Sequence, residues 1–218
     1  MSCFIIRYLL TATVSVLFAT APHAADSDLS VNARLLVSAR NADSAGVDRA
    51  LKEGASPNAR NRLGETVLLI ALKKNDVAMA QTMLAAGADV NIAAVNGVTP
   101  LMAAAYGGQR QMLEALLARG AKVDAVDHLN KNAMTYAAGE GRTEIVVLLI
   151  AKGVDPNAVY NNDLTALMWA AGNGKADTVK ALLAAGAKPG LKDNRGKTAL
   201  DMAREGQYAD VVALLDNA

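Results

Sequence analysis

Residues 99–109 read TPLMAAAYGGQ, and residues 165–175 read TALMWAAGNGK. The two stretches begin 66 residues apart, which is twice 33, and the period of 33 also aligns the rest of the chain. Without any insertion, it produces one column of Thr or Asn and one column of Gly: Thr66, Thr99, Asn132, Thr165 and Thr198, and Gly54, Gly87, Gly120, Gly153 and Gly186. A fixed period of about 20 to 50 residues is typical of an array of supersecondary units.

Each unit carries the signals of two short helices. Thr99 can cap a helix that starts at Pro100, because the hydroxyl accepts a bond from a free amide and proline has no amide hydrogen. We expect this first helix to run for about eight residues and to end at a residue that tolerates a left-handed backbone. Those residues are Asn75, Gly108, Gly141 and Gly174. A second helix follows, for example over 177–185, and ends at the Gly column. Because helices this short are marginal in water, the pairs must stack on one another.

Three stretches resemble the ankyrin-repeat family: Gly97-Val98-Thr99-Pro100-Leu101, Thr165-Ala166-Leu167 and Gly87-Ala88-Asp89-Val90-Asn91. The resemblance implies an all-α ankyrin-repeat solenoid with hairpin-like loop tips and about six units, of which two are terminal caps. The expected units are 28–58, 59–91, 92–124, 125–157, 158–190 and 191–218. The departures are Ala33 in place of threonine, and Asn132-Ala133 in place of Thr-Pro.

The first helices should have one buried face and one free face. Helical spacing places positions two, five and six after the threonine column toward the stack, and positions four, seven and eight on another face. In proteins similar to ankyrins this second face lines a concave groove beside the loop tips. Gly139 and Gly172 follow Tyr136 and Trp169 by three residues, so we expect the faces of those rings to be open.

Aromatic side chains on this face are the usual centres of a protein interface. We therefore predict a partner-binding surface, although the rings could instead simply pack against loops. Its predicted residues on the first helices are Ile70, Lys73, Lys74, Tyr106, Tyr136, Glu140, Trp169, Asn173 and Met202. Its predicted residues on the loop tips are Leu63, His128, Leu129, Tyr160, Asn162 and Leu164.

The N-terminus has the pattern of a secretory signal peptide, which we assign to residues 1–25. Arg7 precedes an apolar run over residues 8–19, which is shorter than the roughly 18 to 20 residues that span a bilayer. A permanent anchor is the alternative. Cleavage would remove Cys3, the only cysteine. An exported chain without cysteine favours a bacterial periplasm, and we expect no stable membrane insertion after cleavage.

Charge and composition argue against two other classes of function. Removing Arg7 leaves 21 basic and 21 acidic residues, so the mature chain lacks the basic excess that nucleic-acid binding usually needs. It would also keep a single histidine, His128, and no thiol. We therefore predict no enzyme activity, no catalytic or metal site and no cofactor, and a monomer that binds another protein.

The family resemblance suggests two versions of that role. One is an accessory protein of an envelope enzyme such as a periplasmic catalase. The other is an inhibitor or immunity protein that occludes a toxin or a cell-wall hydrolase. A purely structural array with no dedicated partner is a third alternative.

Overall fold

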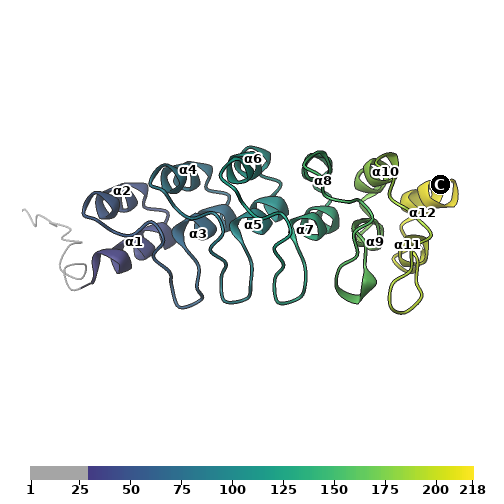
Figure 1. Cartoon of the computed structure of the whole chain (residues 1–218), viewed down its shortest axis with the longest axis horizontal. Helices are drawn as coiled ribbons and strands as arrows, with labels where there is room; N and C mark the ends of the chain where they lie inside the picture. Colours follow the sequence, from purple (N-terminus) through teal and green to yellow (C-terminus); the bar gives the residue numbers. More distant parts are fainter. Residues whose placement is uncertain (1–28) are drawn as a thin grey trace, which may run out of the picture.

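The computed structural model describes residues 29–218, so the predicted signal peptide lies outside it. The described residues form a single row of helix pairs, with second helices in one layer, first helices in the layer beneath and loop tips pointing away from both (Figure 1). This arrangement confirms the predicted all-α solenoid. The first helices are α1 (Val31–Arg40), α3 (Val67–Lys73), α5 (Pro100–Gly107), α7 (Ala133–Glu140), α9 (Ala166–Gly172) and α11 (Ala199–Glu205). The second helices are α2 (Ser44–Lys52), α4 (Val77–Ala85), α6 (Arg110–Ala118), α8 (Thr143–Ala151), α10 (Ala176–Ala184) and α12 (Ala209–Asp216).

The threonine column caps the first helices. The Thr99 hydroxyl accepts a hydrogen bond from the Met102 amide at 3.3 Å, and the other threonines of the column make the equivalent bond. Asn132 caps α7 in the same way, by accepting from the Thr135 amide at 3.0 Å. The first unit differs, because Ser30 caps α1 and Ala33 lies inside the helix. A cap three residues upstream thus replaces the missing threonine and lengthens α1.

The predicted helix stops adopt the left-handed backbone. Asn75 has φ 58°, and Gly108 and Gly141 have φ 70° and 75°. The same column holds Ala42 with φ 57° in the first unit and Gln207 with φ 58° in the last. The turn between the two helices is therefore conserved in geometry across the array, even where the terminal units lack a residue that favours it.

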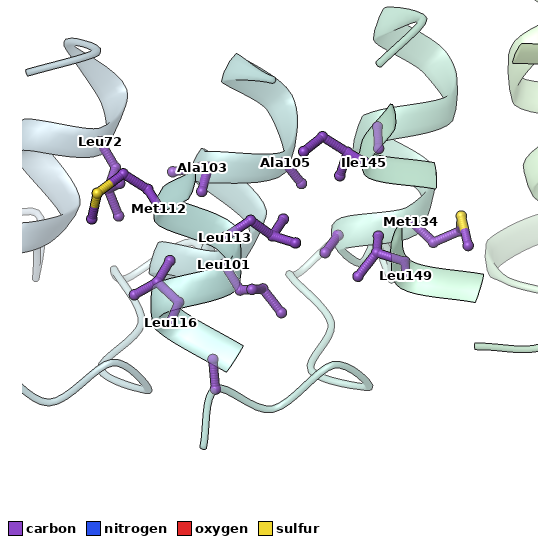
Figure 2. Packing of buried hydrophobic residues seen from close by; sticks show 14 of the residues in the cluster. Leu72, Leu101, Ala103, Ala105, Met112, Leu113, Leu116, Met134, Ile145 and Leu149 are labelled. Carbon is purple, nitrogen blue, oxygen red and sulfur yellow. The ribbon is translucent and has the colours of Figure 1, made fainter. Parts of the chain in front are cut away.

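The core is one continuous cluster that runs through the stack. Figure 2 shows its centre, where side chains of α5 and α6 meet those of the neighbouring units. Positions two, five and six of α5 are Leu101, Ala104 and Ala105, and none is more than 1 % exposed. The alanines allow close approach of neighbouring first helices, while leucines such as Leu113 and Leu116 fill the seam to the second helices. Each unit thus hides its apolar face on its neighbours.

Asparagines at the ends of the units bond one unit to the next. Asn91 Oδ1 accepts from the Lys122 amide at 2.9 Å, and its Nδ2 donates to the Gly120 carbonyl at 3.1 Å. Asn157 makes the same two bonds to the Lys188 amide and the Gly186 carbonyl. Asp124 occupies this position between the third and fourth units.

Within residues 29–218, Asp124 makes neither bond. A carboxylate has no hydrogen to donate to the carbonyl that an asparagine would reach. A hollow of about 500 Å³ lies at the same junction between α6 and α8, lined by Val123, Leu117 and Leu148 among others. The junction of the third and fourth units is therefore less completely bonded than the neighbouring ones.

We expect Asp124→Asn to raise the free energy of unfolding by about 1 to 2 kcal/mol, because two hydrogen bonds form that Asp124 does not make, and one of them needs a donor that a carboxylate lacks. Urea unfolding followed by circular dichroism would measure the gain. Asp124→Ala is the control, since it removes the charge but provides neither bond. An equal gain in both variants would show that charge, and not the missing bonds, weakens this junction.

Candidate functional site

The predicted binding residues of the first helices differ in exposure. Lys73, Lys74, Tyr106 and Asn173 are exposed, and Tyr136, Glu140, Trp169 and Met202 are half-buried. Ile70 is only 8 % exposed, so the structure corrects its placement on the free face. Five of the eight remaining residues lie on the first helices α3, α5, α7 and α9, and Met202 lies on α11. Lys74 and Asn173 are the cap residues that directly follow α3 and α9.

Position four leans toward the preceding unit, which explains this difference. Tyr136 meets Tyr106 of the preceding unit edge to face, with ring centroids 6.1 Å apart and planes at 79°. A Cβ placed on Gly139 would lie 3.7 Å from the Trp169 ring, and one on Gly172 would lie 3.7 Å from Met202. The next unit therefore fills the space above the two glycines. The side chain at position four therefore takes part in the contact between units, and at Ile70 this contact buries it.

The loop tips present apolar side chains beside this face. Leu63 and Leu129 are 64 % and 60 % exposed, and His128 and Asn162 are exposed as well. Tyr160 and Leu164 are half-buried and pack against the core. Successive tips are joined through the backbone, for example from the His128 amide to the Asn96 carbonyl at 3.0 Å. Such bonds join the tips of the second, third and fourth units and, separately, those of the fifth and sixth units.

Three aromatic rings and one lysine form the most distinctive cluster on this surface, which we call the aromatic cluster: Tyr106, Lys131, Tyr136 and Trp169. The Lys131 ammonium lies 4.4 Å from the centroid of the Trp169 ring and 5.8 Å from that of Tyr136. Both distances are in the range of cation–π attraction. Lys131 closely follows the predicted tip residues His128 and Leu129 in the chain, but its contact with a ring of the next unit was not predicted.

A hydrogen bond to a buried carboxylate fixes Tyr136 in this cluster. Its hydroxyl donates to Asp127 Oδ2 at 2.7 Å, and Asp127 is only 5 % exposed. Asp127 Oδ1 accepts from the amides of Leu129 and Lys131 at 2.8 and 2.9 Å. Burial, and then the bond to and the charge of Asp127, raise the pKa of Tyr136 well above its ordinary value. The tip of the fourth unit is thereby tied to α7.

We expect Tyr136→Phe to lower the free energy of unfolding by about 1 to 2 kcal/mol at pH 8, because a bond to a charged acceptor is lost. The raised pKa of Tyr136 implies a stabilising contribution that is complete below the pKa of an unfolded tyrosine, about 10, and that declines above it. The difference between the wild type and the variant should therefore shrink between pH 8 and about pH 11. Urea unfolding at both values would measure it, and a constant difference would contradict the linkage.

Two adjoining hollows flank the tyrosines of the aromatic cluster. The larger, of about 300 Å³, is mainly apolar and is lined by Leu72, Val98 and Met102, with Lys73 also in its wall. The smaller, of about 140 Å³, is lined by Lys131, Glu140, Trp169 and Asn173, among others. Tyr106 and Tyr136 belong to both linings. An apolar hollow thus lies next to one with charged groups. Together they could accept an apolar side chain of a partner and a polar side chain next to it.

No group of three or more His, Cys, Asp or Glu side chains within residues 29–218 is placed to hold a metal ion. No helix in that range is long and apolar enough to cross a bilayer.

The fold and the repeated caps define an all-α ankyrin solenoid. The family model described as "Ankyrin repeats (3 copies)" matches residues 35–127 and 134–218. The chain therefore belongs to the ankyrin-repeat family, whose members are generally non-catalytic protein–protein interaction modules. No curated protein matched the chain in a sequence comparison.

Proposed function

We propose that the chain is a non-catalytic module that is exported to the periplasm and binds one protein partner through the first-helix face and the loop tips. The aromatic cluster beside the two hollows is the observation that carries the binding proposal. Large rings that are held by neighbouring units can bury much area with a small loss of side-chain entropy. The N-terminal pattern of Arg7 and the apolar run that follows supports export.

Affinity capture from an envelope fraction tests this function. The full chain and a Tyr136→Ala, Trp169→Ala double variant serve as paired baits, and proteins held only by the wild type are identified by mass spectrometry. We expect at least one such protein. Capture of the same proteins by both baits would contradict binding through the aromatic cluster. Capture of no protein by the wild type would leave the purely structural array as the better description.

The captured protein would also separate the two suggested roles. An accessory role predicts an envelope enzyme such as a catalase, whose activity is maintained or increased when the chain is added. An inhibitor or immunity role predicts a toxin or a cell-wall hydrolase, whose activity falls in proportion to the chain added. Cell fractionation with an antibody to the chain would test the periplasmic location.

A further inference from the structure

A comparison between units reveals a charge pair that the fourth unit lacks. In the second unit, Glu65 at the tip pairs with Lys73 on α3 at 2.7 Å. In the sixth unit, Lys197 and Glu205 occupy the same two positions with the charges exchanged, and pair at 2.5 Å. The residue before the threonine column and the residue seven after it are thus close enough to form an ion pair.

In the fourth unit these positions hold Lys131 and Gly139, so the cation has no carboxylate opposite it. Trp169 of the next unit occupies the space over Gly139, and the Lys131 ammonium lies on its ring. Among residues 29–218, this ammonium has no carboxylate within 4.0 Å and no hydrogen-bond acceptor. An ammonium group has three donors, and no acceptor of the described chain takes any of them here.

Neither nearby acid forms an ion pair with this ammonium. Both oxygens of Asp127 already accept hydrogen bonds, and Asp127 is only 5 % exposed. Glu140 lines the same hollow as Lys131 but forms no ion pair with it. On the other side, Lys73 in the wall of the apolar hollow is neutralised by Glu65, and Lys74 beside it pairs with no acid of the described chain.

We propose that Lys131 receives an aspartate or glutamate side chain of the protein partner, and that a neighbouring apolar side chain of the same segment enters the hollow of about 300 Å³. This inference rests on the proposed function, because it names the chemistry of the partner at the same site. The rings already hold the ammonium in place. The lysine side chain therefore loses little conformational freedom when a carboxylate binds to it. The partner thus supplies the charge that Glu205 supplies to Lys197.

Peptide selection on the full chain tests the proposal. Random 12-residue peptides displayed on phage are selected on the immobilised chain, and the enriched sequences are synthesised and titrated by fluorescence anisotropy. We expect enrichment of Asp or Glu close to an apolar residue. Lys131→Met should weaken the affinity for these peptides roughly ten- to hundredfold, because a charge-assisted hydrogen bond is lost. Lys131→Arg should retain most of the affinity.

The repeat supplies matched controls. Lys197→Met removes the lysine at the same position of the sixth unit, where it is already paired, and should leave the affinity unchanged. Gly139→Glu rebuilds the internal ion pair and should weaken binding much more than Gly139→Gln, which adds similar bulk without charge. Glu140→Gln should strengthen the binding of an acidic peptide, whereas it would weaken a basic one. Thermal unfolding of each variant shows whether it is folded.

The outcomes separate this inference from the proposed function. Enriched peptides that are basic or uncharged, or that bind Lys131→Met as well as wild type, would contradict the proposal that Lys131 binds a carboxylate. If their binding is nevertheless lost in the Tyr136→Ala, Trp169→Ala variant, the protein-binding function stands. A selection that yields no peptide sensitive to either set of variants would overturn the proposed carboxylate receptor, and the capture experiment would then decide the function on its own.

Discussion

Leu113→Ala is expected to lower the free energy of unfolding by about 2 to 5 kcal/mol, the range for truncating a buried leucine. Leu113 lies on α6, is 0 % exposed and packs in the centre of the cluster that Figure 2 shows. Its removal leaves a cavity between side chains that are held by the backbones of two helices. Because protein interiors are close-packed, the surroundings can fill that cavity only in part.

The position of Leu113 in the middle of the array should add a second effect. Units of a solenoid are stabilised through their nearest neighbours, so a weak central unit also weakens the coupling between the two ends. We expect urea unfolding to become broader, with a smaller slope, as the ends begin to unfold separately. Val147→Ala on α8 is the control, since Val147 is 51 % exposed and its loss should change stability by less than about 0.5 kcal/mol. A similar small change for Leu113→Ala would contradict the stacked core.

The fold could be predicted because the repeat signals act locally. A threonine that caps a helix and a glycine that ends one depend on residues within the same turn. For this reason Thr99, Asn132 and Gly108 have in the structure the roles that the sequence indicates. The exception, Ala33, was visible as a departure, but the earlier start of α1 at Val31 depended on a cap, Ser30, outside the repeat register.

The binding surface was harder to predict because its details depend on contacts between units. Helical spacing placed Ile70 and Trp169 on the same face, yet the lean of position four toward the preceding unit buries one and half-buries the other. Lys131 gains its role from a tryptophan 38 residues later in the chain and from the absence of a side chain at Gly139. Aligning the units for charge pairs would have shown that the fourth unit lacks one. The contact with Trp169 itself needed the structure.

Tyr106→Ala is expected to weaken the affinity for the protein partner about thirtyfold or more, with little loss of folding stability. Tyr106 is 51 % exposed and contributes to the linings of both hollows, so it is placed as a central contact of the proposed interface. Truncating such a central ring typically costs at least about 2 kcal/mol of binding free energy. Its edge-to-face contact with Tyr136 should cost only about 0.5 to 1.5 kcal/mol of folding free energy.

Trp169→Ala provides the contrast that makes this prediction specific. The Trp169 ring is half-buried against α7 and under Lys131, so its loss should reduce folding stability as well as binding. Urea unfolding and titration of the captured partner, performed on both variants, would separate the two effects. If Tyr106→Ala binds as tightly as wild type while Trp169→Ala loses stability, the rings serve the stack alone. That result would contradict an interface centred on the aromatic cluster, because Tyr106 is the most exposed ring of the cluster and lines both hollows.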